Sequence, residues 1–163
     1  MPPDDPVYLS PDLKTLRLAT PELDSAKLAR FLAYQRALVE HATSSPGKAA
    51  FGQAHAVAME VSKLTPKELS RIGPVVADFA GRRWTAHRLA ARHDALVAKG
   101  KTGAALTPRE AETLRKLPLE LRKARDTHAM GQRYGAAVVE LLMANEAEWV
   151  ALHERVTALA RGG

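Results

Sequence analysis

The sequence contains no cysteine among its 163 residues. Disulfide bonds, thiolate metal sites and covalent haem attachment through a Cys-x-x-Cys-His motif are therefore excluded. Aromatic residues are also few, with three Phe, three Tyr and two Trp. A core so poor in aromatic rings must depend on interdigitated Leu, Val and Ala side chains, and alanine in particular favours helix.

Long apolar segments are missing as well. No apolar run approaches the roughly 20 residues that a helix needs to cross a bilayer. The first six residues, MPPDDP, are polar and do not begin an apolar signal segment. We therefore expect a cytoplasmic protein with no transmembrane segment, although an exported domain with its signal removed would have the same sequence.

The sequence also lacks the motifs of common catalytic and metal sites. No two of its six histidines are three or four residues apart, the spacing that places two rings on one helix face. There is no Gly-x-Ser-x-Gly motif, and segment 100–103, GKTG, lacks the residue order of a phosphate-binding loop. The sequence thus predicts no cofactor and favours a non-enzymatic protein.

The clearest features present are helix starts. Three Thr-Pro pairs combine a capping hydroxyl with a proline at the first helical position, where the missing N–H costs nothing. These pairs are Thr20-Pro21, Thr65-Pro66 and Thr107-Pro108. Glu68 and Glu110 follow the second and third threonine by three residues, which predicts a capping box at each.

Apolar residues at helical spacing predict an all-α fold. We expect helices over residues 21–42, 47–64, 66–72, 74–99, 108–117 and 118–161, with breaks or kinks near Gly73-Pro74 and at Pro118. The last helix would exceed about 40 residues, or about 60 Å. The predicted architecture is an antiparallel helical bundle with a long helical hairpin formed by the two C-terminal helices.

The domain organisation follows from the prolines. Residues 1–19 contain four of them, which predicts an extended N-terminal arm. Residues 20–163 are long enough for one core and should form a single helical domain.

Several polar residues fall within or beside the predicted apolar stripes. A buried polar group without a partner costs a few kcal/mol, so these side chains should pair with one another or with water. They would form a polar pocket in the interior, form a network that fixes helix register, or reach solvent from the stripe edge. The residues are Gln35, Arg83, His128, Glu146 and His153.

Basic residues are concentrated in one region. From Gly81 to Arg133 there are 13 Lys and Arg against 5 Asp and Glu, whereas the remainder has 11 against 13. If the two C-terminal helices form a hairpin, this region is its distal end, and its cations should form one electropositive surface. The residues expected there are Arg88, Arg92, Lys99, Lys101, Arg115, Lys116, Arg122 and Lys123.

These features favour a helical interaction or scaffold module whose partner is another protein. Polyanion binding through residues 81–133, to nucleic acid or an anionic lipid surface, is one alternative. Binding of a small ligand or cofactor in the bundle interior is a second alternative, and homo-oligomerisation stays open.

Overall fold

The computed structural model describes residues 23–44 and 47–161. These residues form α2 (Ser25–Ser44), α3 (Lys48–Ser62), α4 (Pro66–Lys101), α5 (Pro108–Arg125), α6 (His128–Tyr134), α7 (Ala136–Met143) and α8 (Glu146–Arg161). No strand occurs in the two described ranges, and the predicted all-α class is confirmed. The predicted N-terminal arm at 1–19 and the helix start at Thr20-Pro21 lie outside the described residues.

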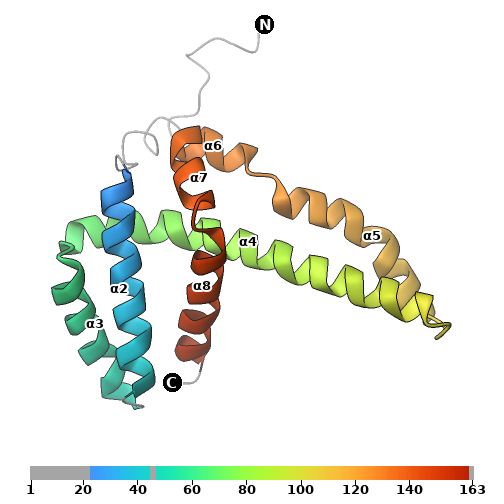
Figure 1. The fold of residues 1–163 in the computed structure, drawn as a ribbon, viewed down its shortest axis with the longest axis horizontal. Coiled ribbons are helices and arrows are strands. Elements are labelled where there is room, and N and C mark those ends of the chain that lie inside the picture. Colours follow the sequence, from blue (N-terminus) through green and yellow to red (C-terminus); the bar gives the residue numbers. More distant parts are fainter. Residues whose placement is uncertain (1–22, 45–46, 162–163) are drawn as a thin grey trace, which may run out of the picture.

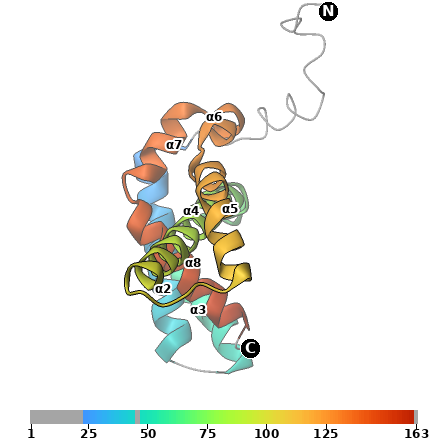
Figure 2. The same ribbon diagram turned by 90° about the vertical axis from the view of Figure 1, so that its right-hand side faces the viewer.

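The body of the molecule is built from α2, α3, α8 and the first half of α4. α2 packs along α3, α8 lies beside α2, and α4 crosses α2 and α8 (Figures 1 and 2). The short helices α6 and α7 carry the chain from the end of α5 back to α8.

The second half of α4 leaves the body and projects together with α5 as a two-helix hairpin (Figure 1). Near its tip, Lys99 Nζ donates to Glu110 at 2.8 Å, and at its root the Arg83 guanidinium donates to the Arg125 carbonyl at 3.2 Å. These two contacts show that α5 runs antiparallel to α4. The predicted hairpin is therefore present, but it consists of α4 and α5 alone, since the chain after residue 125 turns back to the body.

The main hydrophobic core lies in the body. Its buried residues come from segments 23–80 and 130–152, and none comes from the described segment 81–129. Phe79, Trp149 and Leu142 are among its largest members and are at most 1% exposed. The hairpin is held by a separate seam between its helices, where Leu117 is 1% exposed.

Of the break or kink predicted near Gly73-Pro74, the break is wrong, because α4 runs without interruption from Pro66 to Lys101. A proline inside a helix removes a hydrogen bond and costs about 3 kcal/mol. Ile72 and Val76 on either side of it are each 1% exposed. Burial of such a side chain contributes about 1.5–3 kcal/mol. A helix break that removed both side chains from the core would therefore cost more than the proline does inside the helix.

Of the restart or kink predicted at Pro118, the restart is also wrong, because α5 continues through Pro118 from Pro108 to Arg125. Pro118 is exposed, whereas its neighbour Leu117 is fully buried within the hairpin. The ring thus lies on the outer side of the helix while the inner side keeps its packing on α4.

The chain after residue 125 is not the single long helix that we expected. Asp126 departs from helical geometry with ψ 118, and its carboxylate accepts a hydrogen bond from the His128 N–H at 2.9 Å. Gly135, with φ 95, separates α6 from α7 in a conformation that glycine adopts at little cost. A third interruption at Ala144-Asn145 precedes α8.

Both predicted capping boxes are confirmed. Thr65 Oγ1 accepts from the Glu68 N–H at 3.2 Å, while the Glu68 carboxylate accepts from the Thr65 N–H at 2.9 Å. Thr107 and Glu110 make the same reciprocal pair at the start of α5. These hydrogen bonds satisfy backbone N–H groups that the first helical turn leaves free.

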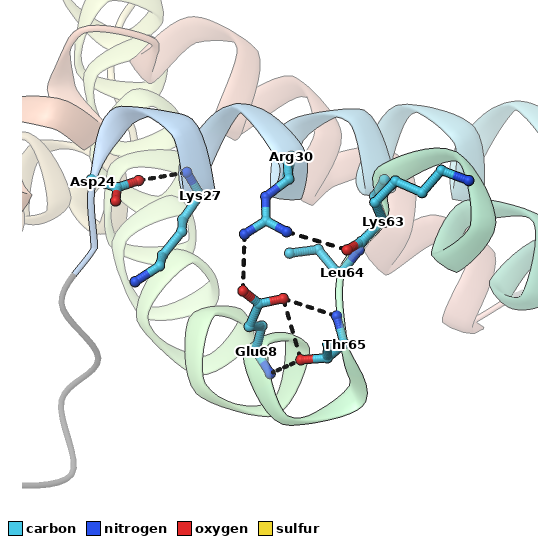
Figure 3. A network of polar contacts seen from close by, with 8 residues as sticks. Asp24, Lys27, Arg30, Lys63, Leu64, Thr65 and Glu68 are labelled. Atoms are coloured by element: carbon cyan, nitrogen blue, oxygen red, sulfur yellow. Dashed lines mark hydrogen bonds and ion pairs between the residues drawn. The ribbon is translucent and has the colours of Figure 1, made fainter.

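One arginine ties α2 to the turn between α3 and α4. Figure 3 shows Arg30 donating to the Glu68 carboxylate at 2.9 Å and to the Lys63 carbonyl at 3.2 Å. The same view shows Asp24 accepting from the Lys27 N–H at 2.7 Å. Asp24 is therefore the N-cap of α2, which begins at Ser25.

Candidate functional site

The hairpin, residues 81–125, carries the basic charge of the protein. It contains 12 Lys and Arg against 4 Asp and Glu. It extends away from α2 and α3 in Figure 1 and points toward the viewer in Figure 2. Its outer sides are therefore open to a partner.

The acidic residues of the hairpin neutralise few of these cations. Glu110 accepts from Lys99 Nζ at 2.8 Å through each of its oxygens, and Glu112 pairs with Lys116 at 2.7 Å. The hydrogen bond from Lys99, followed by that from the Thr107 N–H, holds the pKa of Glu110 below its usual value. Of the eight cations expected at a partner surface, these pairs engage only Lys99 and Lys116.

The other six expected cations are exposed and have no acidic partner among the described residues. Arg88 makes one further contact, with its guanidinium 4.7 Å from the centre of the Trp84 ring. Like charges gathered on one arm repel, and an anionic partner would relieve that repulsion. The six residues are Arg88, Arg92, Lys101, Arg115, Arg122 and Lys123.

Helical periodicity divides six of the eight cations between two sides of the hairpin. Arg83 and His93 of α4 face α5, since Arg83 bonds the Arg125 carbonyl and His93 lines a groove with α5 residues. Arg88 and Arg92 lie about half a turn around α4 from them, and so occupy its outward side. The basic pairs at 115–116 and 122–123 lie opposite the buried Leu117 on α5. Lys99 and Lys101 lie near the tip.

The outward side of α5 also carries an exposed leucine. Leu119 is 55% exposed and stands three and four residues from four cations, the spacing of neighbours on a helix surface. A groove of about 710 Å³ adjoins it. We name Arg115, Lys116, Leu119, Arg122 and Lys123 the α5 surface. The groove is lined by Pro118, Leu119, Leu121, Arg122, Lys123, Arg125, Asp126 and, from α4, His93.

Two of the five interior polar residues form an ion pair at the root of the hairpin. Arg83 Nε donates to Glu146 Oε1 at 2.8 Å, with side chains 13% and 19% exposed. The His87 ring lies 3.0 Å from the same oxygen. Burial raises the pKa of Glu146, but the hydrogen bonds from Arg83 and His87 outweigh it and leave that pKa below its usual value. This cluster joins α4 to α8.

The other three interior candidates do not join that cluster. His128 is exposed at the start of α6. His153 is half-buried, with its ring 5.9 Å from that of Trp84. Gln35 is half-buried, and its Oε1 atom has no hydrogen-bond partner among the described residues, which is also true of Trp149 Nε1 in the core. The structure therefore does not bring the five residues together into one pocket.

Sequence reasoning missed His87 and Leu119. His87 gave no signal, because its partner Glu146 lies on another helix. The four basic neighbours of Leu119 were readable, but the predicted restart at Pro118 cut Arg115 and Lys116 off from the leucine. A continuous helix restores the pattern.

The described residues contain no group of three or more His, Cys, Asp or Glu side chains placed to hold a metal ion. No helix in them combines the length and apolar character required to span a bilayer. Comparison with family models, with curated protein sequences and with solved structures finds no match to this chain.

Proposed function

We propose that this chain is a non-enzymatic helical interaction module that binds a negatively charged partner through the hairpin. The observation that carries the proposal is the set of six exposed cations without an acidic partner among the described residues. They stand on a two-helix projection that contributes nothing to the main core. Because the hairpin lies outside the main core, its surface residues can contact a partner without loss of core packing.

The body supports this role as a rigid base. Capping at Thr65, the Arg30 contacts and the Arg83–Glu146 pair fix the first half of α4 against α2 and α8. Because α4 is one continuous helix, its distal half is held at a defined angle to the body. As the sequence suggests, we expect the module to act in the cytoplasm.

The test is binding of defined polyanions across a salt series. Duplex DNA, polyglutamate and vesicles containing anionic lipid would each be titrated with the full chain from low to physiological salt. Binding that weakens as salt rises is the expected result, since each cation–anion contact is screened. If the chain binds none of the three at low salt, the proposal is overturned and the basic surface is only solvated.

A charge-reversal variant locates the contact. Replacing Arg115, Lys116, Arg122 and Lys123 by Glu removes positive charge from α5 without touching a buried residue. Such a variant should lose polyanion binding and keep its helix content. Equal binding by the parent and this variant would mean that the contact lies elsewhere.

A further inference from the structure

The α5 surface combines positive charge with an exposed apolar side chain, and binding to a purely anionic partner would not require that side chain. At its centre is Leu119, which is 55% exposed, with cationic neighbours on both its N-terminal and C-terminal sides. The adjoining groove continues the apolar character through Pro118 and Leu121. A phosphate backbone offers no apolar surface to cover such a site, and α5 carries no aromatic ring on which a base could stack.

The basic residues of the α5 surface repeat at a spacing that fits a partner helix better than a small anionic ligand. Arg115 and Arg122 are seven residues apart, as are Lys116 and Lys123. Seven residues are two helical turns, about 10.5 Å along the axis. In helix pairs, an apolar seam flanked by charges at seven-residue intervals sets the choice of partner. The complement is a helix with one apolar stripe and acidic residues on both sides of it.

The outward side of α4 lacks this combination. Arg88 and Arg92 are exposed there, but no large hydrophobic side chain between residues 85 and 95 is among the strongly exposed ones. Arg88 is also partly engaged by Trp84. The two sides of the hairpin therefore differ in apolar content while sharing positive charge, so Arg88 and Arg92 serve as control cations away from the α5 surface.

We propose that the α5 surface docks an acidic amphipathic helix of a partner protein, with an apolar side chain of that helix covering Leu119. This inference rests on the proposed function, which it narrows to one surface and one class of partner. Carboxylates of the partner helix pair with Arg115, Arg122 and Lys123 and compete with Glu112 for Lys116. Its apolar stripe lies over Leu119 and the mouth of the groove. Burial of the leucine supplies selectivity, and the charges supply attraction.

The experiment compares three labelled probes against the full chain at about 50 mM salt, where ionic contacts are strong. The first is an acidic helical peptide of about 20 residues, which spans about 30 Å, with a leucine stripe. The second has the same charge but serine in place of each leucine. The third is a duplex DNA of similar length. Fluorescence anisotropy gives each affinity.

The leucine peptide should bind the parent about tenfold more tightly than the serine peptide, and Leu119→Ser should remove that advantage. The serine peptide and DNA should be indifferent to Leu119→Ser. Reversal of the four α5 cations should abolish binding of the leucine peptide. The control Arg88→Glu with Arg92→Glu should bind within about twofold of the parent, because these charges face away.

The outcomes separate the two proposals. If the chain binds both peptides equally, or binds DNA most tightly with no effect of Leu119→Ser, the inference is overturned while polyanion binding stands. If it binds no anionic probe, the proposed function fails and the inference fails with it. Since Leu119 is exposed, Leu119→Ser should keep the parent's circular dichroism spectrum, which excludes misfolding as the cause of any loss.

Discussion

Glu146 links the body to the root of the hairpin through Arg83 and His87. Its pKa in the folded protein lies below the usual value of 4.5, so the unfolded chain takes up a proton first as pH falls. The stabilisation is therefore complete above about pH 4.5 and is lost as pH falls through the lowered pKa. Glu68 and Glu110, whose pKa values are also lowered, act in the same direction.

We predict that Glu146→Gln destabilises the protein at neutral pH by about 1.5 kcal/mol, because a hydrogen-bonded charge facing Arg83 is removed. The gap between parent and variant should shrink as pH falls below about 4.5 and through the lowered pKa of Glu146, because the parent carboxylate then becomes protonated too. Urea unfolding at several pH values measures both the destabilisation at neutral pH and its decrease at lower pH. A gap that stays constant over this range would show that Glu146 titrates normally or is not coupled to Arg83.

Lys63 ends α3 in the left-handed conformation, with φ 57 and ψ 22. A residue with a β-carbon pays about 1–2 kcal/mol for this geometry, whereas glycine pays almost none but loses more entropy on folding. Both backbone contacts of Lys63, to Met59 and Arg30, would survive substitution. Lys63→Gly should therefore raise the free energy of unfolding by about 0.5–1 kcal/mol. Lys63→Ala keeps the β-carbon and should show no such gain.

At the scale of the helices, the two capping boxes have the same chemistry in different surroundings. Thr65→Ala and Thr107→Ala should each cost about 1 kcal/mol of helix stability. Thr65 stands beside the core through Glu68 and Arg30, so its loss should shift the urea midpoint of the whole chain. Thr107 lies near the hairpin tip, so its loss should mainly speed amide exchange within α5. The Thr→Ser variants keep the cap and serve as controls.

An equal shift of the global midpoint by both alanine variants would contradict this separation. It would mean that the hairpin and the body unfold as one unit. The prediction thus measures how far the body and the projection behave independently.

The helix class and the starts at Thr65-Pro66 and Thr107-Pro108 were predictable from the sequence, because a cap is a local interaction. The interruptions were not. Pro74 stays inside α4 because packing of its neighbours outweighs a local cost, and that packing involves α2. Conversely, the chain breaks at Asp126 and Gly135, where the sequence pattern alone suggested continuity. The cationic residues were identified, but their division between two sides depends on the register of α5 against α4, which Lys99 and Arg83 fix only in three dimensions.

At the scale of the whole molecule, the position of the core assigns stability of the fold to the body and leaves the hairpin for the proposed binding. Residues 81–129 contribute nothing to the main core, although they make up much of the length of α4 and all of α5. The body contains the main hydrophobic core, and the hairpin carries the excess of positive charge. Such a division lets the hairpin surface vary without loss of the fold, because exposed substitutions there change stability little.

The last prediction tests this division directly. Replacing residues 88–120 by a loop of about four Gly and Ser residues should leave a folded body, since antiparallel neighbours are joined by loops of this length. The shortened chain keeps Arg83, His87, Arg125 and Glu146, so the contacts between α4, α5 and α8 at the root persist. It should unfold in one cooperative urea transition with a midpoint close to that of the parent. Its slope should be smaller, because less surface is exposed on unfolding. The same protein should no longer bind anionic probes. A shortened chain that lacks a cooperative transition would show that the body needs the hairpin, and the assignment of the fold to one part and binding to the other would be wrong.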